Sequence, residues 1–433
     1  MNKKYFLLPL QVLILFAPIL YTALGRLFSP VFFLWLTFLA WQGFQQPRHR
    51  SIIPFGKTIG ILFIALPAFM LFQTLPLPLF LLRLISPATV RALTFLQGSP
   101  PTFHAISLLP FETFIYALQI AIIGIFFWMM ISLKWEKEQI IDLLTTVLMS
   151  ALVLMFASLT PLVSRSERHF SYYLVMVFPL APALLLLRLR YLESSSGLME
   201  KFLSRVGRKN SIFGFLFATV VLPLGIIYSR SRTALLIFLL SCLLFALWTY
   251  YFRRSRSVRK RLRKIFLAVI VLAALMGIVT LTKQLKQGTR ETPPERVRWS
   301  QTFSMFKAFP LTGTGFGSWE SAITLYDRLD EAQWTPYANN GYLEIAAEGG
   351  LAGGLILFLL IAVTGVTVFK MWRARRHPEV KIIGLGIITC LFSASLLFIF
   401  NASLRIHSHM FVFTLLLALG IKIATHKRRH GIR

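Results

Sequence analysis

The sequence predicts an all-α, polytopic bundle of about twelve transmembrane helices, and three observations support this fold class. Of the 433 residues, 56% are hydrophobic and only 14% are charged, whereas a soluble domain usually carries about 25% charged residues. Apolar runs close to the ~20 residues that cross a bilayer recur from end to end. The basic residues, which give a net charge of +30, lie mostly between these runs.

The apolar runs define the expected spans in chain order. They are 6–24, 28–44, 58–82, 113–133, 139–163, 170–187, 211–228, 233–251, 265–282, 351–370, 382–402 and 410–424. The first follows Lys3 and Lys4 and resembles a signal peptide, but residues 21–26 make a poor cleavage site and a second apolar run follows at once. We therefore expect an uncleaved first helix.

The basic segments predict the topology. If the N-terminus is cytoplasmic, the richly basic segments all fall on the cytoplasmic side, as the positive-inside rule requires. These segments are 45–57, 188–210, 252–264, 371–381 and the tail 425–433. The charge then signals topology and attraction to anionic membrane lipids, so no nucleic-acid partner is expected. The prediction is a multi-pass protein with both termini in the cytoplasm.

The opposite face holds one long loop, 283–350, which is the only segment there with enough polar sequence to build a site. We divide the chain into N-terminal transmembrane helices (1–163), a second transmembrane region that includes the loop (164–424) and the basic tail (425–433). Within the loop, Trp299, Phe303 and Phe306 share one face of an expected helix. That helix, from Glu295 to Phe309, is expected to lie in the membrane interface.

Arginines on the outer side indicate an anion site. Ser229-Arg230-Ser231-Arg232 separates two apolar spans, where positive charge gains nothing from the positive-inside rule. A guanidinium binds phosphate oxygens in a bidentate manner, although such arginines also extend toward lipid head groups. Further candidate cations on this face are Arg165, Arg168, Arg290, Arg296 and Arg298. No carboxylate-rich motif suggests a metal, and Cys242 and Cys390 lie inside apolar spans, so neither a disulfide nor a metal or other cofactor is expected.

The end of the long loop, residues 337–353, places polar groups at the membrane surface. Asn340, Glu344 and Glu348 are spaced to share one helix face. A glutamate there can act as a general base, bind a sugar hydroxyl or pair with an arginine. A capped helix start, with Asn at the cap and Glu in the first turn, explains the same residues structurally.

Four blocks in this order resemble the O-antigen ligase and polymerase superfamily of bacterial envelope glycan enzymes. Residues 168–180 resemble its asparagine-histidine-phenylalanine helix start, with Arg168 and His169. Residues 229–236 resemble its serine-any-serine-arginine block, which makes Arg232 the matching arginine. Residues 296–299 with Pro310 and 313–315 resemble its arginine-tryptophan, proline and glycine-any-glycine block. Residues 339–353 resemble its histidine-asparagine-any-tyrosine-leucine block.

The resemblance implies a metal-independent glycosyltransferase at the outer face of the bacterial cytoplasmic membrane. The donor would be a glycan on polyprenyl (undecaprenyl) diphosphate, and the acceptor lipid A core, as in lipopolysaccharide synthesis, another lipid-linked repeat or a protein. The candidate catalytic residues are Arg232, Arg296, Arg298, Asn339 and Glu348. The candidate substrate-binding residues are Arg168, His169, Arg230, Asn340, Tyr342, Glu344, His407 and His409. A transporter or flippase without chemistry is the alternative, and a relative that only binds glycans is a third possibility.

One position departs from the family pattern. Asn339 stands where the ligases usually have histidine, and an amide cannot take up a proton at neutral pH. Either another group serves as base, with His407 and His409 as candidates, or the acceptor needs little activation, or the transfer is a different one. We expect chemistry without a base, because a diphosphate leaves readily and the arginines supply the main stabilisation.

Overall fold

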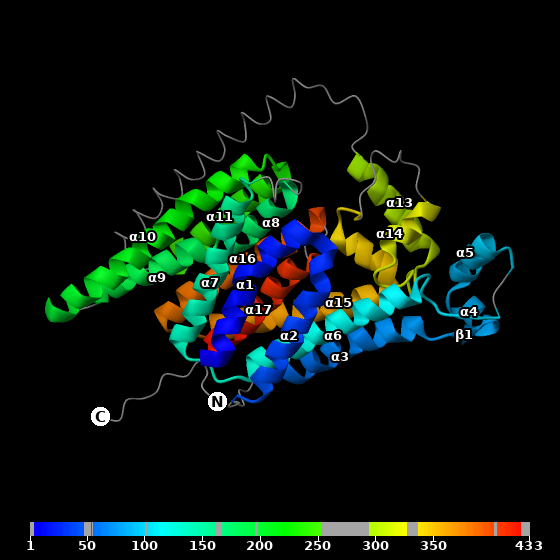
Figure 1. The fold of residues 1–433 in the computed structure, drawn as a ribbon, viewed down its shortest axis with the longest axis horizontal. Coiled ribbons are helices and arrows are strands. Elements are labelled where there is room, and N and C mark those ends of the chain that lie inside the picture. Colours follow the sequence, from blue (N-terminus) through cyan, green and yellow to red (C-terminus); the bar gives the residue numbers. More distant parts are fainter. Residues whose placement is uncertain are drawn as a thin grey trace, which may run out of the picture.

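The computed structural model describes residues 4–46, 53, 55–99, 102–160, 167–194, 198–252, 294–326, 337–401 and 405–425. It is the predicted all-α bundle (Figure 1). The helices before the long loop are α1 (Lys4–Leu24), η1 (Gly25–Phe28), α2 (Ser29–Phe44), α3 (Gly56–Thr74), α4 (Leu79–Ile85), α5 (Pro87–Gln97), α6 (Pro110–Ser132), α7 (Lys137–Ala157), α8 (Glu167–Val177), α9 (Leu180–Ser194), α10 (Leu198–Tyr228) and α11 (Arg232–Phe252). Those of the loop and beyond are α13 (Pro294–Ala308), α14 (Trp319–Ala322), η3 (Ile323–Leu325), α15 (Gly341–Arg373), α16 (Pro378–Phe400) and α17 (His407–Thr425).

Within the described ranges, nine helical stretches are long and apolar enough to cross a membrane, and Ile212–Tyr228 adds a shorter apolar helix. The first stretch, Phe6–Phe44, contains both α1 and α2. Every predicted span therefore overlaps a helix except 265–282, which lies outside the described residues, and the span 170–187 consists of two helices, α8 and α9. The chain is a multi-pass membrane protein.

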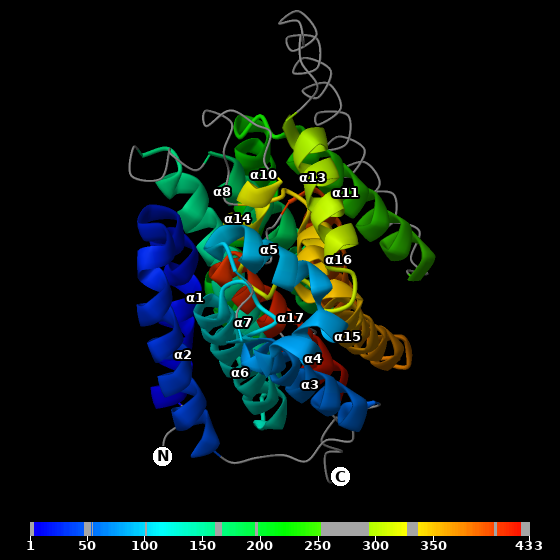
Figure 2. The same cartoon turned by 90° about the vertical axis from the view of Figure 1, so that its right-hand side faces the viewer.

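The helices alternate in direction as the basic segments predict. The end of α1 and the starts of α6 and α17 line one cavity through Tyr21, Glu112 and His407. At the opposite end Lys137, at the start of α7, pairs with Glu379 of α16. α1 therefore begins, and α17 finishes, at the end away from the cavity, and in Figure 2 the dark blue start of α1 lies opposite α13 and α14. We call the two ends of the bundle the cavity end and the termini end.

The bundle has a central core and a lipid-facing periphery. In α17, 89% of the most apolar stretch is buried inside the protein, and in Phe170–Arg190 94% is buried, against 22% in α3. A helix that is apolar all round is either buried or faces lipid. α8, α9 and α17 thus form the core of the bundle. The buried hydroxyls of Ser150 on α7 and Tyr173 on α8 hydrogen-bond to each other at 2.7 Å, so neither is left without a partner inside the core.

Two predicted spans have different bounds from those expected. α3 ends at Thr74 instead of 82, because Pro76 and Pro78 cannot continue a helix. The residues that follow form a two-residue antiparallel pair, β1 (Leu77–Pro78) with β2 (Phe103–His104), and the short helices α4 and α5. α15 begins ten residues before the predicted 351, so a full extra helical segment lies at the cavity end.

The predicted loop helix exists as α13, but a different face of it is buried. Arg298, Thr302 and Met305 are buried, whereas Phe303 is 45% exposed and Trp299 and Phe306 are half-buried. The protein contacts the face with Arg298 and Thr302. Of the three aromatic side chains only Phe303 is exposed, because Phe306 packs against the buried cluster around Met305 and the Trp299 indole nitrogen is buried. The position of this helix in the membrane interface stays a prediction.

Candidate functional site

The turn between α10 and α11, residues 229–232, presents two arginines at the cavity end. We call it the arginine turn. The Ser229 hydroxyl donates to the Ile226 carbonyl (2.7 Å) and accepts from the Ser231 N–H (3.3 Å). The Ser231 hydroxyl caps α11 by accepting from Ala234 N–H (3.3 Å). Both serines therefore shape the turn, while Arg230 (φ 52°) and Arg232 are exposed.

α15 is broken at Gly350, where φ is 60° and ψ is −163°, a backbone region open almost only to glycine. Residues 310–315 lie in the break and supply the hydrogen bonds that the broken helix lacks. Leu351 N–H donates to the Pro310 carbonyl (2.8 Å), and Thr314 N–H donates to the Ala347 carbonyl (3.1 Å). We call this arrangement the glycine interlock.

Close backbone contact explains the glycines on both sides of the interlock. A Cβ on Gly350 would lie 2.4 Å from the Leu311 carbonyl carbon, and one on Gly313 would lie 2.2 Å from that of Glu348. The fully buried Gln73 amide of α3 donates to the carbonyls of Thr312 (2.6 Å) and Glu348 (3.0 Å). Residues 310–315 and residues 347–351, which belong to two separate sequence blocks, thus form one structural unit.

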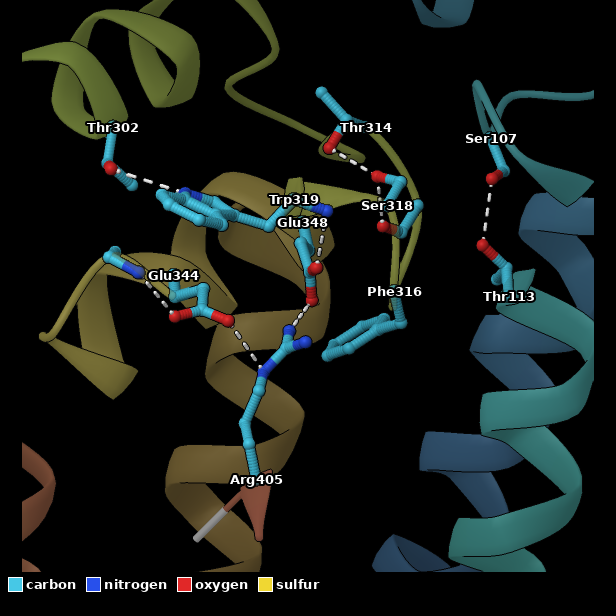
Figure 3. A network of polar contacts seen from close by, with 12 residues as sticks. Ser107, Thr113, Thr302, Thr314, Phe316, Ser318, Trp319, Glu344, Glu348 and Arg405 are labelled. Carbon is cyan, nitrogen blue, oxygen red and sulfur yellow. Dashed lines mark hydrogen bonds and ion pairs between the residues drawn. The ribbon is translucent and has the colours of Figure 1, made fainter. Parts of the chain in front are cut away.

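The interlock positions a buried ion-pair cluster, which we call the clamp. Its members are Glu344 and Glu348, on the first half of α15, and Arg405, just before α17 (Figure 3). Arg405 Nε lies 2.9 Å from a Glu344 carboxylate oxygen, and its Nη2 contacts Glu348. Both glutamates are fully buried. Burial is the largest influence on the Arg405 pKa and lowers it, but the Glu344 carboxylate together with Tyr116 and Tyr337 raises the pKa above its ordinary value.

The remaining carboxylate oxygens of the clamp bind the loop backbone. Glu348 accepts from Trp319 N–H (2.8 Å), and Glu344 accepts from Ala338 N–H (3.1 Å). The Trp319 indole in turn donates to the Thr302 hydroxyl of α13 (3.2 Å; Figure 3). The clamp therefore ties α13, the loop and α15 to the bundle.

A cavity of about 690 Å³ lies beside the clamp. Residues of α1, α2 and α6, the loop around Trp319, and Tyr337, Arg405 and His407 line it. Its deeper walls are apolar, with Phe33, Leu34 and Ile122. Pockets of this size, mostly apolar with a few converging polar groups, are typical ligand sites.

The structure brings only some of the predicted site residues together. Glu344, Glu348 and His407 meet at the clamp and cavity. Asn340 caps α15 by accepting from Leu343 N–H (3.0 Å), as the structural explanation predicted. Asn339 adopts a left-handed conformation (φ 55°) just before the cap.

The other candidates lie apart from the cavity lining. Tyr342 packs against Phe398 of α16, and His409 is buried beside Tyr173 in the core. His407 and His409 precede the predicted span 410–424, but both lie in the first turn of α17. Arg296 is exposed and Arg298 buried on α13. Arg168 and His169 lie on α8, but their side chains are outside the described part of the structure. Arg165 and Arg290 lie outside the described residues.

Sequence reasoning missed several cavity residues. Arg405 is the centre of the clamp, and Arg26 forms an ion pair with Glu320 at the cavity mouth. Glu112 lines the cavity from the first turn of α6. The available signal was that these are charged residues beside apolar spans in a chain with only 16 acidic residues.

Comparison with known proteins identifies the part of the chain that carries these features. Residues 217–359 match a family described as O-Antigen ligase, and none of the curated proteins compared matches the chain. The matched region runs from the apolar part of α10 into the second half of α15, and includes the arginine turn, the interlock and both clamp glutamates. The resembling block at 168–180 lies before it. The chain is therefore a multi-pass membrane protein with an O-antigen ligase domain over residues 217–359.

Proposed function

We propose that this protein transfers a glycan from polyprenyl diphosphate to an acceptor hydroxyl at the outer face of the bacterial cytoplasmic membrane, with both termini cytoplasmic. The observation that carries this proposal is the position of the exposed arginine turn. It lies inside the O-antigen ligase domain and at the same end of the bundle as the cavity. The acceptor is lipid A core or a second lipid-linked repeat.

The arginine turn is proposed to bind the diphosphate. Arg230 and Arg232 are exposed on a turn whose backbone the two serines fix. Preorganised guanidinium groups stabilise the charge that develops on a leaving diphosphate without reorganisation during the reaction. Arg296, exposed on α13, supplies a further cation, whereas buried Arg298 is assigned a positioning role.

The clamp glutamates are proposed to position the site instead of acting as bases. Both oxygens of Glu348 are engaged, by Trp319 N–H and by Arg405. Glu344 is engaged by Ala338 N–H and by the same arginine. Glu348 therefore has both oxygens in hydrogen bonds, whereas one Glu344 oxygen has only its ion pair with Arg405 and no hydrogen bond. Both carboxylates are buried and hold the loop that covers the cavity.

A transporter remains the second candidate, because broken helices mark transport sites in many transporters. In those proteins the ends of the half-helices bind the substrate or ion. Here residues 310–315 already use the groups at the break, through the bonds to Pro310 and Ala347. The break therefore serves loop docking, which favours the enzyme.

Substitution of Arg232 tests the proposal. Arg232→Ala should lower transfer by about 10²–10³-fold, the usual effect of losing one charge-stabilising donor, with unchanged thermal stability. Arg232→Lys should also lose most activity, because the charge remains but the bidentate geometry does not. The assay uses donor and acceptor lipids extracted from a strain lacking this gene, with Arg376→Ala at the termini end as control. A fully active Arg232→Ala protein would leave the transporter as the better account.

Labelling of single cysteines tests the orientation. Ser321 and Arg376 are both exposed, at the cavity end and the termini end. In intact cells a membrane-impermeant maleimide should label Ser321→Cys and leave Arg376→Cys unlabelled until the cells are opened. The buried Cys242 and Cys390 should stay unlabelled in both. The reverse pattern would place the arginine turn in the cytoplasm and remove the proposed site.

A further inference from the structure

The cavity reaches from the membrane surface into the bilayer along α6. Glu112, Tyr116 and Gln119 share one face of α6 at i, i+4 and i+7, and Ile122 follows deeper. Ten residues of helix separate Glu112 from Ile122, which is ~15 Å, or about half of the hydrocarbon thickness. The upper part is polar and the lower part apolar, so the cavity fits an amphiphile whose polar group stays near Glu112.

The charges around the cavity disfavour an anionic ligand. Arg26, Arg405, Glu112 and Glu320 line it, and Glu344 and Glu348 stand behind Arg405. Two arginines and four glutamates give this group a formal charge of −2. A diphosphate would therefore bind better at the arginine turn, whereas hydroxyl groups, which donate to carboxylates, suit the cavity. The class of ligand that fits is an uncharged portion of a glycan.

The two histidines proposed as bases are not available for a substrate hydroxyl. His407 contacts the Ser29 hydroxyl through Nδ1 (3.0 Å) and the Gln119 amide oxygen through Nε2 (3.2 Å), so both ring nitrogens are engaged. His409 packs against Tyr173 in the bundle core. Neither side chain can approach an acceptor in the cavity without breaking these contacts.

The carboxylates at the cavity differ in whether they form an ion pair. Glu320 pairs with Arg26, and Glu344 and Glu348 pair with Arg405. Glu112 is exposed and lines the cavity, and no ion pair joins it to a cation within the described residues. Gly317 lies against its backbone, where a Cβ would stand 3.5 Å from the Glu112 carbonyl oxygen.

We propose that the cavity binds the acceptor glycan and that Glu112 is the general base that accepts the proton of the acceptor hydroxyl. This rests on the proposed function, and it replaces the expectation, drawn from Asn339 in the sequence, that the transfer needs no base. The acceptor oxygen forms a bond to the anomeric carbon as its proton passes to the Glu112 carboxylate. The bond from that carbon to the phosphate oxygen breaks, and its electron pair leaves with the polyprenyl diphosphate. Glu112 then releases the proton to water, and no other reactant is required.

A purely structural role for Glu112 also has to be tested. A glutamate in the first turn of a helix is favoured by the helix dipole wherever that helix lies. Glu138 provides the matched control, because it is an exposed glutamate in the first turn of α7 at the termini end. Glu138→Gln should reproduce any effect that comes from the helix start alone.

The kinetic experiment uses purified protein in nanodiscs with the extracted donor and acceptor lipids. Glu112→Gln should lower kcat by about 10²-fold or more, the usual scale for loss of a general base, with a small change in KM. The wild-type rate should fall toward acidic pH, Glu112→Asp should retain that fall at a reduced rate, and Glu112→Gln should lose it. The other titratable or charged groups that line the cavity are Tyr21, Arg26, Tyr116, Glu320, Tyr337, Arg405 and His407. His407→Gln, which should keep the pH profile, separates the histidine from Glu112.

A binding experiment separates this inference from the proposed function. Leu118→Cys places a thiol on the exposed part of the cavity wall, and its rate of maleimide labelling can be measured without turnover. The acceptor extract should slow labelling and the donor extract alone should not. The inference would be overturned if Glu112→Gln transferred the glycan as fast as the wild type. It would also be overturned if the donor extract alone slowed the labelling of Leu118→Cys. Either result would leave the proposed function intact. Absence of wild-type transfer with both lipids present would overturn the proposed function itself.

Discussion

The arginine turn and the clamp both place arginine at the cavity end, but in opposite environments. Arg230 and Arg232 are exposed on a short turn. Arg405 has only 10% of its side chain exposed and lies between two fully buried carboxylates. The first region has excess positive charge near water, and the second has a formal charge of −1 inside the protein.

This difference separates ligand binding from support. An exposed guanidinium can approach a phosphate from water, whereas Arg405 would leave two carboxylates unpaired in a buried site if it turned toward a ligand. Removing one partner of a buried ion pair is strongly destabilising, while an exposed pair contributes little. We therefore expect changes at the clamp to alter stability and changes at the turn to alter catalysis.

The largest expected effect is on the clamp. Arg405→Met should destabilise the protein by about 3–5 kcal/mol, because it leaves Glu344 and Glu348 buried without their cation. Thermal unfolding in detergent measures this. Arg26→Met, which breaks the more exposed pair with Glu320, is the control and should cost no more than about 1 kcal/mol.

A second experiment on the clamp asks whether charge or shape matters. Adding Glu344→Gln and Glu348→Gln to Arg405→Met should restore part of the lost stability, because no unpaired charge remains. If Arg405→Met unfolds normally but loses transfer, the clamp arginine acts on substrate, and the division between the two regions is wrong.

The interlock should be nearly as sensitive as the clamp that it positions. Gly350→Ala places a Cβ 2.4 Å from the Leu311 carbonyl carbon in a backbone region closed to alanine, so we expect a loss of about 3 kcal/mol. Gly365→Ala in the same helix is the control, since its Cβ meets no atom within 4 Å. That change should be neutral or stabilising by up to about 1 kcal/mol. Equal melting temperatures for the two variants would mean that the loop is not docked in the break.

The fold was largely predictable because membrane spans are determined locally. Each needs only about 20 apolar residues, and the basic segments between the spans predict which side of the membrane each loop faces. The errors came from local exceptions, such as Pro76 and Pro78, which end α3 early. The span was expected to start at 351, because the residues before Gly350 are too polar for a span, and a helix start capped by Asn340 was one explanation of those residues. The structure shows that capped start, so the helix begins at Gly341.

The site was less predictable because its contacts join distant segments. The spacing of Glu344 and Glu348 indicated one helix face, but nothing in the sequence shows that Arg405, 57 residues beyond Glu348, lies between them. Likewise the cavity combines α1, α2, α6 and the loop, and Glu112 looks like an ordinary helix-start glutamate. Motif resemblance identified the arginine turn and both parts of the interlock, which lie in the matched family region.

A smaller effect is expected at the start of α15. Asn340→Ala removes the cap on Leu343 N–H and should cost about 1 kcal/mol. Asn340→Asp keeps an acceptor oxygen, so this variant should retain most of the stability that Asn340→Ala loses. If Asn340→Ala also lowers transfer far more than this stability change explains, Asn340 binds substrate in addition to capping the helix, and the functional region extends beyond the turn and cavity.

The smallest effect is expected at Asn339, the position where related ligases usually carry histidine. Both Asn and His tolerate a left-handed backbone, so Asn339→His should fold normally. Among the described residues, Asn339 is not part of the cavity lining, so a new imidazole there would add no base beside an acceptor bound near Glu112. Transfer should stay within about fivefold of wild type, equivalent to ~1 kcal/mol in the barrier. A much larger gain, together with loss of the dependence on Glu112, would show that the base belongs at position 339 and that the cavity supports the reaction only indirectly.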